Sequence, residues 1–182
     1  MVYLFLANGF EEIEALTPVD VLRRVGVEVL TVSINEGSKK VVGAHGIEVT
    51  SDLTLDEYKE DTAEMLILPG GSDGTKNLGD NPRIKEILLS AAERGLYIAA
   101  ICAAPTILAK MGLLEKEKAT CYPSLASVLI ENGVKYKNDK VVCSSRFITS
   151  MGAGTSGEFA FTLVEKLLSK QKATEVRLAM VY

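Results

Sequence analysis

The residues YIAAICAAPT, at positions 97–106, join an apolar run to a helical pattern through a single cysteine. The run 97–101 has the length and composition of a buried strand, and the helical pattern extends over 103–111. Strands that are apolar throughout are typical of parallel sheets, which helices cover on both faces. We therefore expect an α/β protein in which Cys102 stands at the turn between a strand and a helix.

The rest of the chain repeats this alternation. Further segments with the apolar composition of strands lie at 2–7, 27–34, 65–68 and 147–150. Further helical patterns of apolar residues lie at 13–25, 82–94, 123–130 and 155–169. Repeated strand–helix units predict a mostly parallel sheet between two layers of helices, with ligands bound beyond the carboxyl ends of the strands.

Three local features carry more specific predictions. Pro18 lies inside the first helical pattern, so we expect the helix to kink and restart there. The segment 41–50 is typical of a strand pair, and 135–144 of a hairpin. Thr155 and Glu158 have the spacing of a capping box at the start of the last helix.

Length, composition and charge limit the function. The 182 residues predict one domain, 1–182, because 47% hydrophobic and 24% charged residues are an ordinary globular balance. The net charge of −4 argues against a protein that binds nucleic-acid backbones. The longest apolar stretch, 95–109, is shorter than a membrane-spanning helix and contains Pro105, so we expect no membrane association.

Metal ligands and paired cysteines are scarce. The chain has three cysteines, Cys102, Cys121 and Cys143, and one histidine, His45. No two cysteines have the spacing of a zinc knuckle or of a redox pair. We therefore expect no metal, no cofactor and no disulfide framework, and a reducing, cytoplasmic location.

Cys102 is the candidate nucleophile. Small residues, Ala100 and Ala104, stand two positions on either side, as in the Gly-x-Ser-x-Gly elbow of hydrolases, where strand and helix pass closely. A thiol at a helix N-terminus faces free N–H groups and the positive end of the helix dipole, which lower its pKa below the free value of ~8.5. The alternative is a buried cysteine that packs as a small apolar residue.

A second strand-to-helix turn offers hydrogen-bond donors. Gly70 and Gly71 follow the strand 65–68, and the absence of side chains lets their backbone N–H groups approach a ligand closely. Together with the N–H of Ala103, the N–H groups of these two glycines are candidates for an oxyanion hole, although an ordinary glycine turn fits equally well.

A third turn carries three carboxyl groups. Glu14 lies toward the apolar side of the first helix, where a desolvated carboxyl keeps its proton and can hydrogen-bond a thiol or thiolate. Glu11 and Glu12 are expected to be solvated charges at the helix N-terminus. A surface position for Glu14 is the alternative.

Five blocks of residues resemble a known family. They are similar, in family order, to the ThiJ/PfpI superfamily, close to its branch of the parkinsonism-associated protein deglycase. The blocks are ANGFEEIE (7–14), TPVDVLRRVG (17–26), LPGG (68–71), AICAAPT (100–106) and GAGTS (152–156). The resemblance implies a flavodoxin-like three-layer α/β/α sandwich of the class I glutamine amidotransferase type, and a homodimer.

The resemblance also implies roles for four residues. Cys102 is then the nucleophile, and Glu14 is the protonated acid that hydrogen-bonds the thiolate. The backbone N–H groups of Gly71 and Ala103 are then the oxyanion donors.

Three further positions are candidates with alternatives. Many members of the family have His-Pro where this chain has Tyr122-Pro123, so Tyr122 is the candidate base, yet a phenol of pKa ~10 is a poor base at neutral pH. Asp20 matches a family acid near the site. His45 matches a position near the dimer interface of close relatives, where it is either a plain turn residue or reaches the partner's site.

Three functions fit these residues. The first is a cysteine-dependent enzyme, a deglycase or glutathione-independent glyoxalase, that acts on reactive carbonyls such as methylglyoxal or its glycated adducts through Cys102. The second is a sensor of oxidative stress, or a chaperone, with an oxidisable Cys102. The third is an intracellular peptidase or amidase, which the tyrosine at position 122 disfavours. Cys121 fits both packing and a resolving thiol, and Cys143 has no assigned role.

Overall fold

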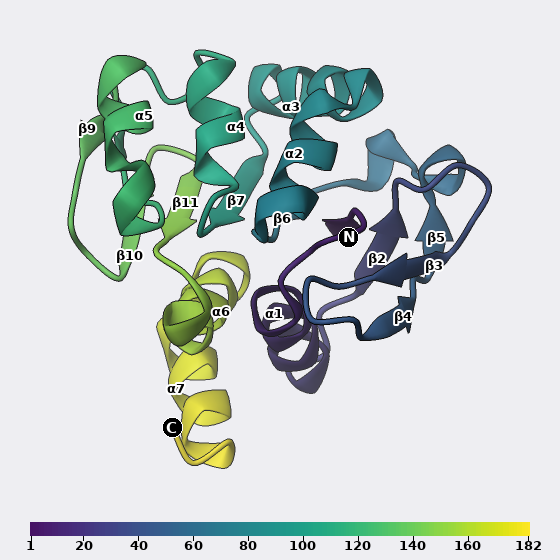
Figure 1. Ribbon diagram of the computed structural model, residues 1–182. Helices are drawn as coiled ribbons and strands as arrows, with labels where there is room; N and C mark the ends of the chain where they lie inside the picture. The colour runs from purple at the N-terminus through teal and green to yellow at the C-terminus, as the bar shows by residue number, and fades with distance from the viewer.

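A seven-stranded sheet runs through the middle of the protein, with helices on both of its faces (Figure 1). The computed structural model describes residues 1–182. The strands of this sheet are β1 (Val2–Leu6), β2 (Val29–Ser33), β5 (Leu53–Thr54), β6 (Met65–Leu68), β7 (Tyr97–Ile101), β10 (Val141–Ser144) and β11 (Phe147–Ser150). Their order is β10-β11-β7-β6-β1-β2-β5, and every neighbouring pair is parallel except β10 and β11.

Two small sheets lie beside the central one. The hairpin of β3 (Lys40–Val42) and β4 (Glu48–Thr50) is antiparallel, which confirms the strand pair expected at 41–50. The strands β8 (Lys118–Ala119) and β9 (Lys135–Tyr136) pair in parallel.

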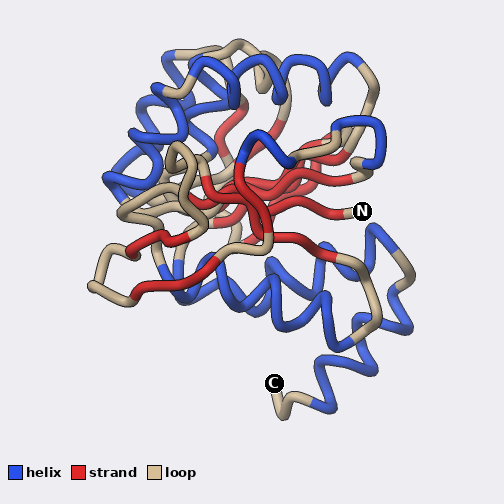
Figure 2. Tube along the Cα trace, turned by 90° about the vertical axis from the view of Figure 1, so that its right-hand side faces the viewer, coloured by secondary structure: helices blue, strands red, loops and turns tan.

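The helices form two layers, which gives the expected three-layer sandwich (Figures 1 and 2). One layer consists of α1 (Glu12–Arg24), α6 (Ser156–Leu167) and α7 (Lys170–Ala179). The other consists of α2 (Ser72–Asp80), α3 (Pro82–Glu93), α4 (Pro105–Lys110) and α5 (Ala126–Glu131). Each helix falls short of the length and apolar character needed to cross a lipid bilayer.

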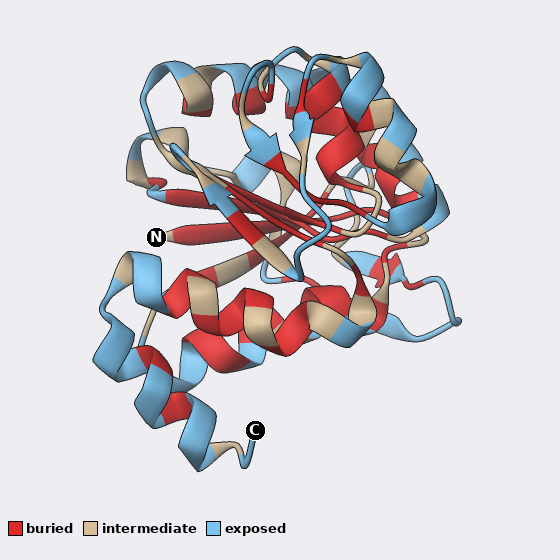
Figure 3. Ribbon diagram, turned by 90° about the vertical axis from the view of Figure 1, so that its left-hand side faces the viewer, coloured by how far each residue is buried: buried red, intermediate tan, exposed pale blue.

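The core consists of two apolar layers, one on each face of the sheet, and the strands between them are buried (Figure 3). Strand β1 shows why: Tyr3 and Phe5 point into one layer, whereas Val2, Leu4 and Leu6 point into the other. Successive side chains of a strand point to opposite faces, so a strand covered on both faces is apolar throughout.

The helix α1 corrects one prediction. It runs from Glu12 to Arg24 without the restart expected at Pro18. Its cap is Glu11, whose carboxylate accepts a hydrogen bond from the Glu14 N–H at 2.8 Å. Pro18 is buried and α1 packs against α6, so tertiary packing offsets the hydrogen bond that the proline cannot make.

Two further predictions are wrong because tertiary partners outweigh local signals. The segment 135–144 is no hairpin: β9 pairs with β8, whereas β10 pairs with β11 through a turn at Ser145, where φ is 50°. Thr155 does not cap α6 as a capping box would; its hydroxyl donates to the carbonyl of Gly152 at 2.8 Å.

The packing of α1 yields a test of the fold. Leu22→Ala empties a fully buried site in the layer between the sheet and α6 and is expected to lower the free energy of unfolding by about 2–5 kcal/mol. Leu178→Ala, at a leucine that is 70% exposed, is the matched control and should change that free energy by less than about 0.5 kcal/mol. Urea unfolding followed by circular dichroism measures both; equal losses would contradict the described core.

Candidate active site

The backbone at Cys102 turns sharply between β7 and α4. Its φ is 65°, in the left-handed region that residues with side chains rarely adopt. Its N–H donates to the carbonyl of Ser150 at 2.9 Å, and its carbonyl accepts from the N–H of Tyr122 at 2.7 Å. Hydrogen bonds from two other segments therefore hold the cysteine in this conformation.

The helix after Cys102 begins later than the sequence predicted. α4 starts at Pro105, not at 103, because the left-handed Cys102 opens a turn whose N–H groups, at Ala104 and Thr106, bond to the carbonyl three residues back. Pro105 suits the first helical turn, where its missing N–H costs nothing. Ala100 and Ala104 are both fully buried, as the close passage of strand and turn requires. Cys102 thus stands in a three-residue turn just ahead of the helix.

Glycines let the neighbouring turn approach the cysteine. A Cβ at Gly70 would lie 2.5 Å from Oε2 of Glu14 and 2.7 Å from Cβ of Cys102. Gly71 has φ of 90°, and a Cβ there would overlap the carbonyl oxygen of Gly9. Side chains at either position would separate the segments that form the site.

Glu14 is buried beside Cys102, and only the glycine at position 70 leaves room for the two side chains to approach. Its Oε2 accepts a hydrogen bond from the N–H of Gly70 at 2.9 Å, and the backbone N–H of Ala153 also lowers the pKa of this carboxyl. Burial raises the pKa of Glu14 to about 7, the hydrogen bonds to its charged form only partly opposing that shift. The surface position considered for Glu14 is therefore wrong.

The pKa of Cys102 departs from the prediction. Burial first, and then the negative charge of Glu14, raise the thiol pKa to about 12, whereas a lowered value was expected. The backbone N–H groups of Gly71 and Ala103 lower the pKa of the thiol, but they do not outweigh burial. Between these two values the Cys102–Glu14 pair holds one proton, and the carboxylate is the acceptor for the proton of the thiol.

Two of the three remaining candidates lie apart from this pair. Asp20 is exposed and forms an ion pair with Arg24 at 2.7 Å on the outer face of α1. His45 is exposed, and its Nδ1 lies 2.7 Å from Oε2 of Glu12, which raises the pKa of the imidazole. Glu12 is buried, which corrects the prediction of a solvated charge; its two carboxylate oxygens hold the ring and the backbone N–H of His45.

Tyr122 lies at the mouth of the site. Its side chain is half exposed, and its Cδ2 lies 3.5 Å from the position that a Cβ would take on Gly152. The same position lies 3.8 Å from Oε1 of Glu14 and 4.0 Å from Sγ of Cys102. A residue with a side chain at 152 would fill the space beside the sulfur.

Gly152, Ala153 and Ser150 belong to the site, although the sequence analysis gave them no role there. Gly152 leaves space beside the sulfur, and the backbone N–H of Ala153 lowers the pKa of Glu14. The carbonyl oxygen of Ser150 accepts a hydrogen bond from the N–H of Cys102. The available signal was the block GAGTS directly after the strand 147–150, because the carboxyl ends of neighbouring parallel strands meet at one edge.

One cluster has the ligand types for a cation. Ligand atoms of Glu11, Glu12 and His45 lie within 4.8 Å of one another. Both oxygens of Glu12 are already bound to His45, and the cluster uses none of the atoms of the Cys102–Glu14 pair. The geometry at Cys102 is therefore that of a thiol with its own proton acceptor and two N–H donors.

Comparisons with known proteins find relatives over nearly the whole chain. A model of the DJ-1/PfpI family matches residues 1–166. Protein dj-1beta of Drosophila melanogaster is 38% identical over 174 residues, 95% of this chain and 92% of the relative. Glutathione-independent glyoxalase DJR-1.2 of Caenorhabditis elegans is 38% identical over 166 residues, 91% and 87% of the two chains. The solved structure of oxidised Toxoplasma gondii DJ-1 has a TM-score of 0.93 at 32% identity and covers 100% of this chain and 97% of its own.

The shared proton predicts an unusual pH profile for the reaction of Cys102 with iodoacetamide. The rate should rise to a plateau with a midpoint at about pH 7, because loss of the first proton from the pair makes the carboxylate available. Glu14→Gln should remove this step. Peptide mass spectrometry measures the rates, with buried Cys121, whose thiol pKa burial raises to about 11, as internal control. The same step in Glu14→Gln would contradict the assignment.

The close approach at Gly70 gives a second prediction. Gly70→Ala places a methyl group against both Glu14 and Cys102 and should slow the alkylation of Cys102 at pH 7 by about tenfold or more, because the two groups separate. Gly154→Ala is the matched control, since nothing lies within 4 Å of its added Cβ. Equal rates in the two variants, both folded by circular dichroism, would show that this approach does not matter.

Proposed function

The chain belongs to the DJ-1/PfpI family, and from that premise we propose that it is a cysteine-dependent enzyme of glutathione-independent glyoxalase or deglycase type. Its substrates are small reactive carbonyls such as methylglyoxal, or their early adducts. The observation that carries the proposal is the burial of the Glu14 carboxyl beside Cys102, where it shifts the pKa of the thiol, with the backbone N–H groups of Gly71 and Ala103 close to the sulfur. The name of the C. elegans relative supports the choice of reaction.

The first step is addition of sulfur to the aldehyde. Sγ of Cys102 bonds to the aldehyde carbon while the carboxylate of Glu14 takes the thiol proton, so the high thiol pKa is overcome within the pair. The aldehyde oxygen becomes an alkoxide, which the N–H groups of Gly71 and Ala103 stabilise. The protonated Glu14 then returns the proton to this oxygen and completes a hemithioacetal.

The second stage moves hydrogen between the two carbons. Glu14 removes the proton from the carbon bonded to sulfur and the former ketone oxygen gains a proton, which gives an enediol. Glu14 then returns its proton to the neighbouring carbon, while the hydroxyl on the carbon bonded to sulfur loses its proton and becomes the thioester carbonyl. The product is a thioester on Cys102, and water hydrolyses it, which returns a proton to the sulfur. The sum is methylglyoxal plus water giving lactate. The chain's own thiol does the work for which glutathione would otherwise be needed, and Glu14 serves each step with a pKa raised to about 7.

The oxidation sensor is the second candidate, and the same donors favour it. The N–H groups of Gly71 and Ala103 suit a negatively charged oxidised sulfur as well as they suit an alkoxide. The similar Toxoplasma structure is of an oxidised protein. Mild peroxide should then add two oxygen atoms to the intact protein and none to Cys102→Ser. An unmodified wild-type mass would exclude the sensor and leave the enzyme untouched.

A peptidase or amidase is disfavoured. Such an enzyme needs a base that also protonates the leaving amine, and the side chain at the mouth of this site is the phenol of Tyr122.

Cytoplasmic location and a homodimer stay part of the proposal. Exposed apolar side chains on α1, Ile13 and Leu16, supply surface for a second copy.

The enzyme proposal predicts lactate formation from methylglyoxal by the purified protein. Cys102→Ser should abolish it, and Glu14→Gln should lower kcat/KM by about 10²–10⁴-fold, the range for loss of a general base. The rate of the wild type should fall as pH drops below about 7, because protonated Glu14 cannot accept the thiol proton.

An enzymatic lactate assay measures these rates. Cys143→Ser is the control, since that thiol is exposed on β10 and should leave the activity unchanged. Equal activity in Cys102→Ser would overturn the proposal.

A further inference from the structure

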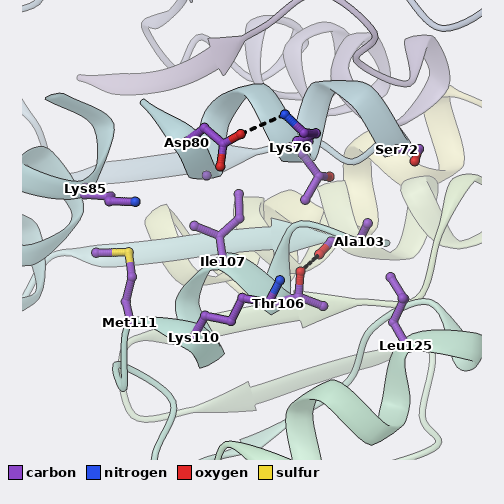
Figure 4. A pocket seen from close by; sticks show the side chains of 12 residues that line it. Ser72, Lys76, Asp80, Lys85, Ala103, Thr106, Ile107, Lys110, Met111 and Leu125 are labelled. Carbon is purple, nitrogen blue, oxygen red and sulfur yellow. Dashed lines mark hydrogen bonds and ion pairs between the residues drawn. The ribbon is translucent and has the colours of Figure 1, made fainter. Parts of the chain in front are cut away.

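A cavity of about 570 Å³ lies between α2 and α4, in the range of pockets that hold small ligands (Figure 4). The start of α3 contributes Lys85 and the segment after Tyr122 contributes Leu125. At Gly79 the two helices are in contact distance, because a Cβ there would touch Cγ1 of Ile107 at 3.4 Å. The cavity contains neither Cys102 nor Glu14; Ala103 is the residue that it shares with the active site.

The charges around this cavity are mostly positive. Lys76, Lys85 and Lys110 line it, and Asp80 is the one acidic residue among the lining residues (Figure 4). Lys76 forms an ion pair with Asp80 at 2.9 Å, and the charges of Lys85 and Lys110 also help to hold the pKa of Asp80 low. Three cations and one carboxylate leave two positive charges, in a chain whose net charge is −4.

Neither Lys85 nor Lys110 is neutralised by the protein itself. Among the ion pairs of the structure, none involves either of these ammonium groups. They come from different helices and lie on either side of Ile107 (Figure 4). Two unpaired lysines that face one opening repel each other, so an anion between them is stabilised.

One part of the cavity wall is apolar. Ile107, Met111 and Leu125 offer side chains against which a small organic group can pack. Thr75 is more than nine-tenths buried in the wall, and its hydroxyl has no hydrogen-bond partner within the protein. A buried hydroxyl without a partner is uncommon, because its desolvation is not compensated.

We propose that this cavity is a second ligand site, which binds a small organic phosphate monoester. The phosphate lies between Lys85 and Lys110, and the organic part packs on Ile107 and Met111. A monoester carries about −1.5 to −2 charges at pH 7, which matches the two surplus positive charges, whereas a carboxylate supplies only one. The proposal is independent of the chemistry at Cys102.

Isothermal titration calorimetry tests the site with phenyl phosphate as probe, and with inorganic phosphate and phenol for comparison. Phenyl phosphate should bind one to one and more tightly than either comparison compound. The variant Lys85→Met/Lys110→Met should bind phenyl phosphate about tenfold or more weakly, because charge-assisted hydrogen bonds are lost. Both lysines are exposed, so the double variant is expected to fold.

The matched control is Lys59→Met/Lys137→Met, which makes the same change of net charge at exposed lysines outside the cavity. It should bind phenyl phosphate as the wild type does. Equal weakening in both double variants, or no binding by the wild type, would overturn the proposal. Equal affinity for inorganic and phenyl phosphate would overturn the organic part of it.

Thr75→Val is a second, independent variant. It keeps the shape of the side chain and removes the unpartnered hydroxyl. Weaker binding of phenyl phosphate, at an unchanged melting temperature or a raised one, would support a ligand contact at Thr75. Unchanged binding would overturn that contact.

Discussion

Cys102 holds a left-handed backbone conformation at the end of β7, and the active site depends on this turn. Such a conformation costs on the order of 1–3 kcal/mol and persists only where the surroundings enforce it. Here Ser150 and Tyr122 do so through the hydrogen bonds to the N–H and the carbonyl of Cys102. The parallel register brings Ile101 beside Ser150 and Ala100 beside Leu68, so the segments after β6 and β11 converge on the sulfur.

Convergence also explains the burial of the Cys102–Glu14 pair. Burial raises the pKa of both groups, and the negative charge of Glu14 raises that of the thiol further, whereas Cys102 lowers the pKa of Glu14. Backbone N–H groups from three segments partly offset the rise of these two pKa values. They belong to Gly70 and Gly71 after β6, to Ala103 after β7 and to Ala153 after β11. A thiol that is weakly acidic by itself thus has a proton acceptor beside it, and the reactivity that we propose belongs to the pair and not to Cys102 alone.

Much of this was predictable from the sequence, and the exceptions have physical causes. Strands buried on both faces are apolar throughout, so 2–7 and 97–101 were identifiable without tertiary information. The sequence did not predict the polar helix α2, because it contains Gly74 and Gly79 and buries few side chains. It did not predict the pairing of β9 with β8, because the two strands are distant in sequence. The direction of the thiol pKa was wrong because burial and the approach of Glu14 are properties of the folded chain.

The most direct test of the shared proton is the pH titration of the Glu14 side-chain carboxyl carbon by NMR, in protein labelled with 13C at that position. The account predicts a midpoint at about pH 7 in the wild type, raised from the ordinary value of 4.5. A midpoint at the ordinary value would mean that Glu14 is a solvated carboxylate at neutral pH. It would then be unable to exchange a proton with Cys102, and the account of the site would be wrong.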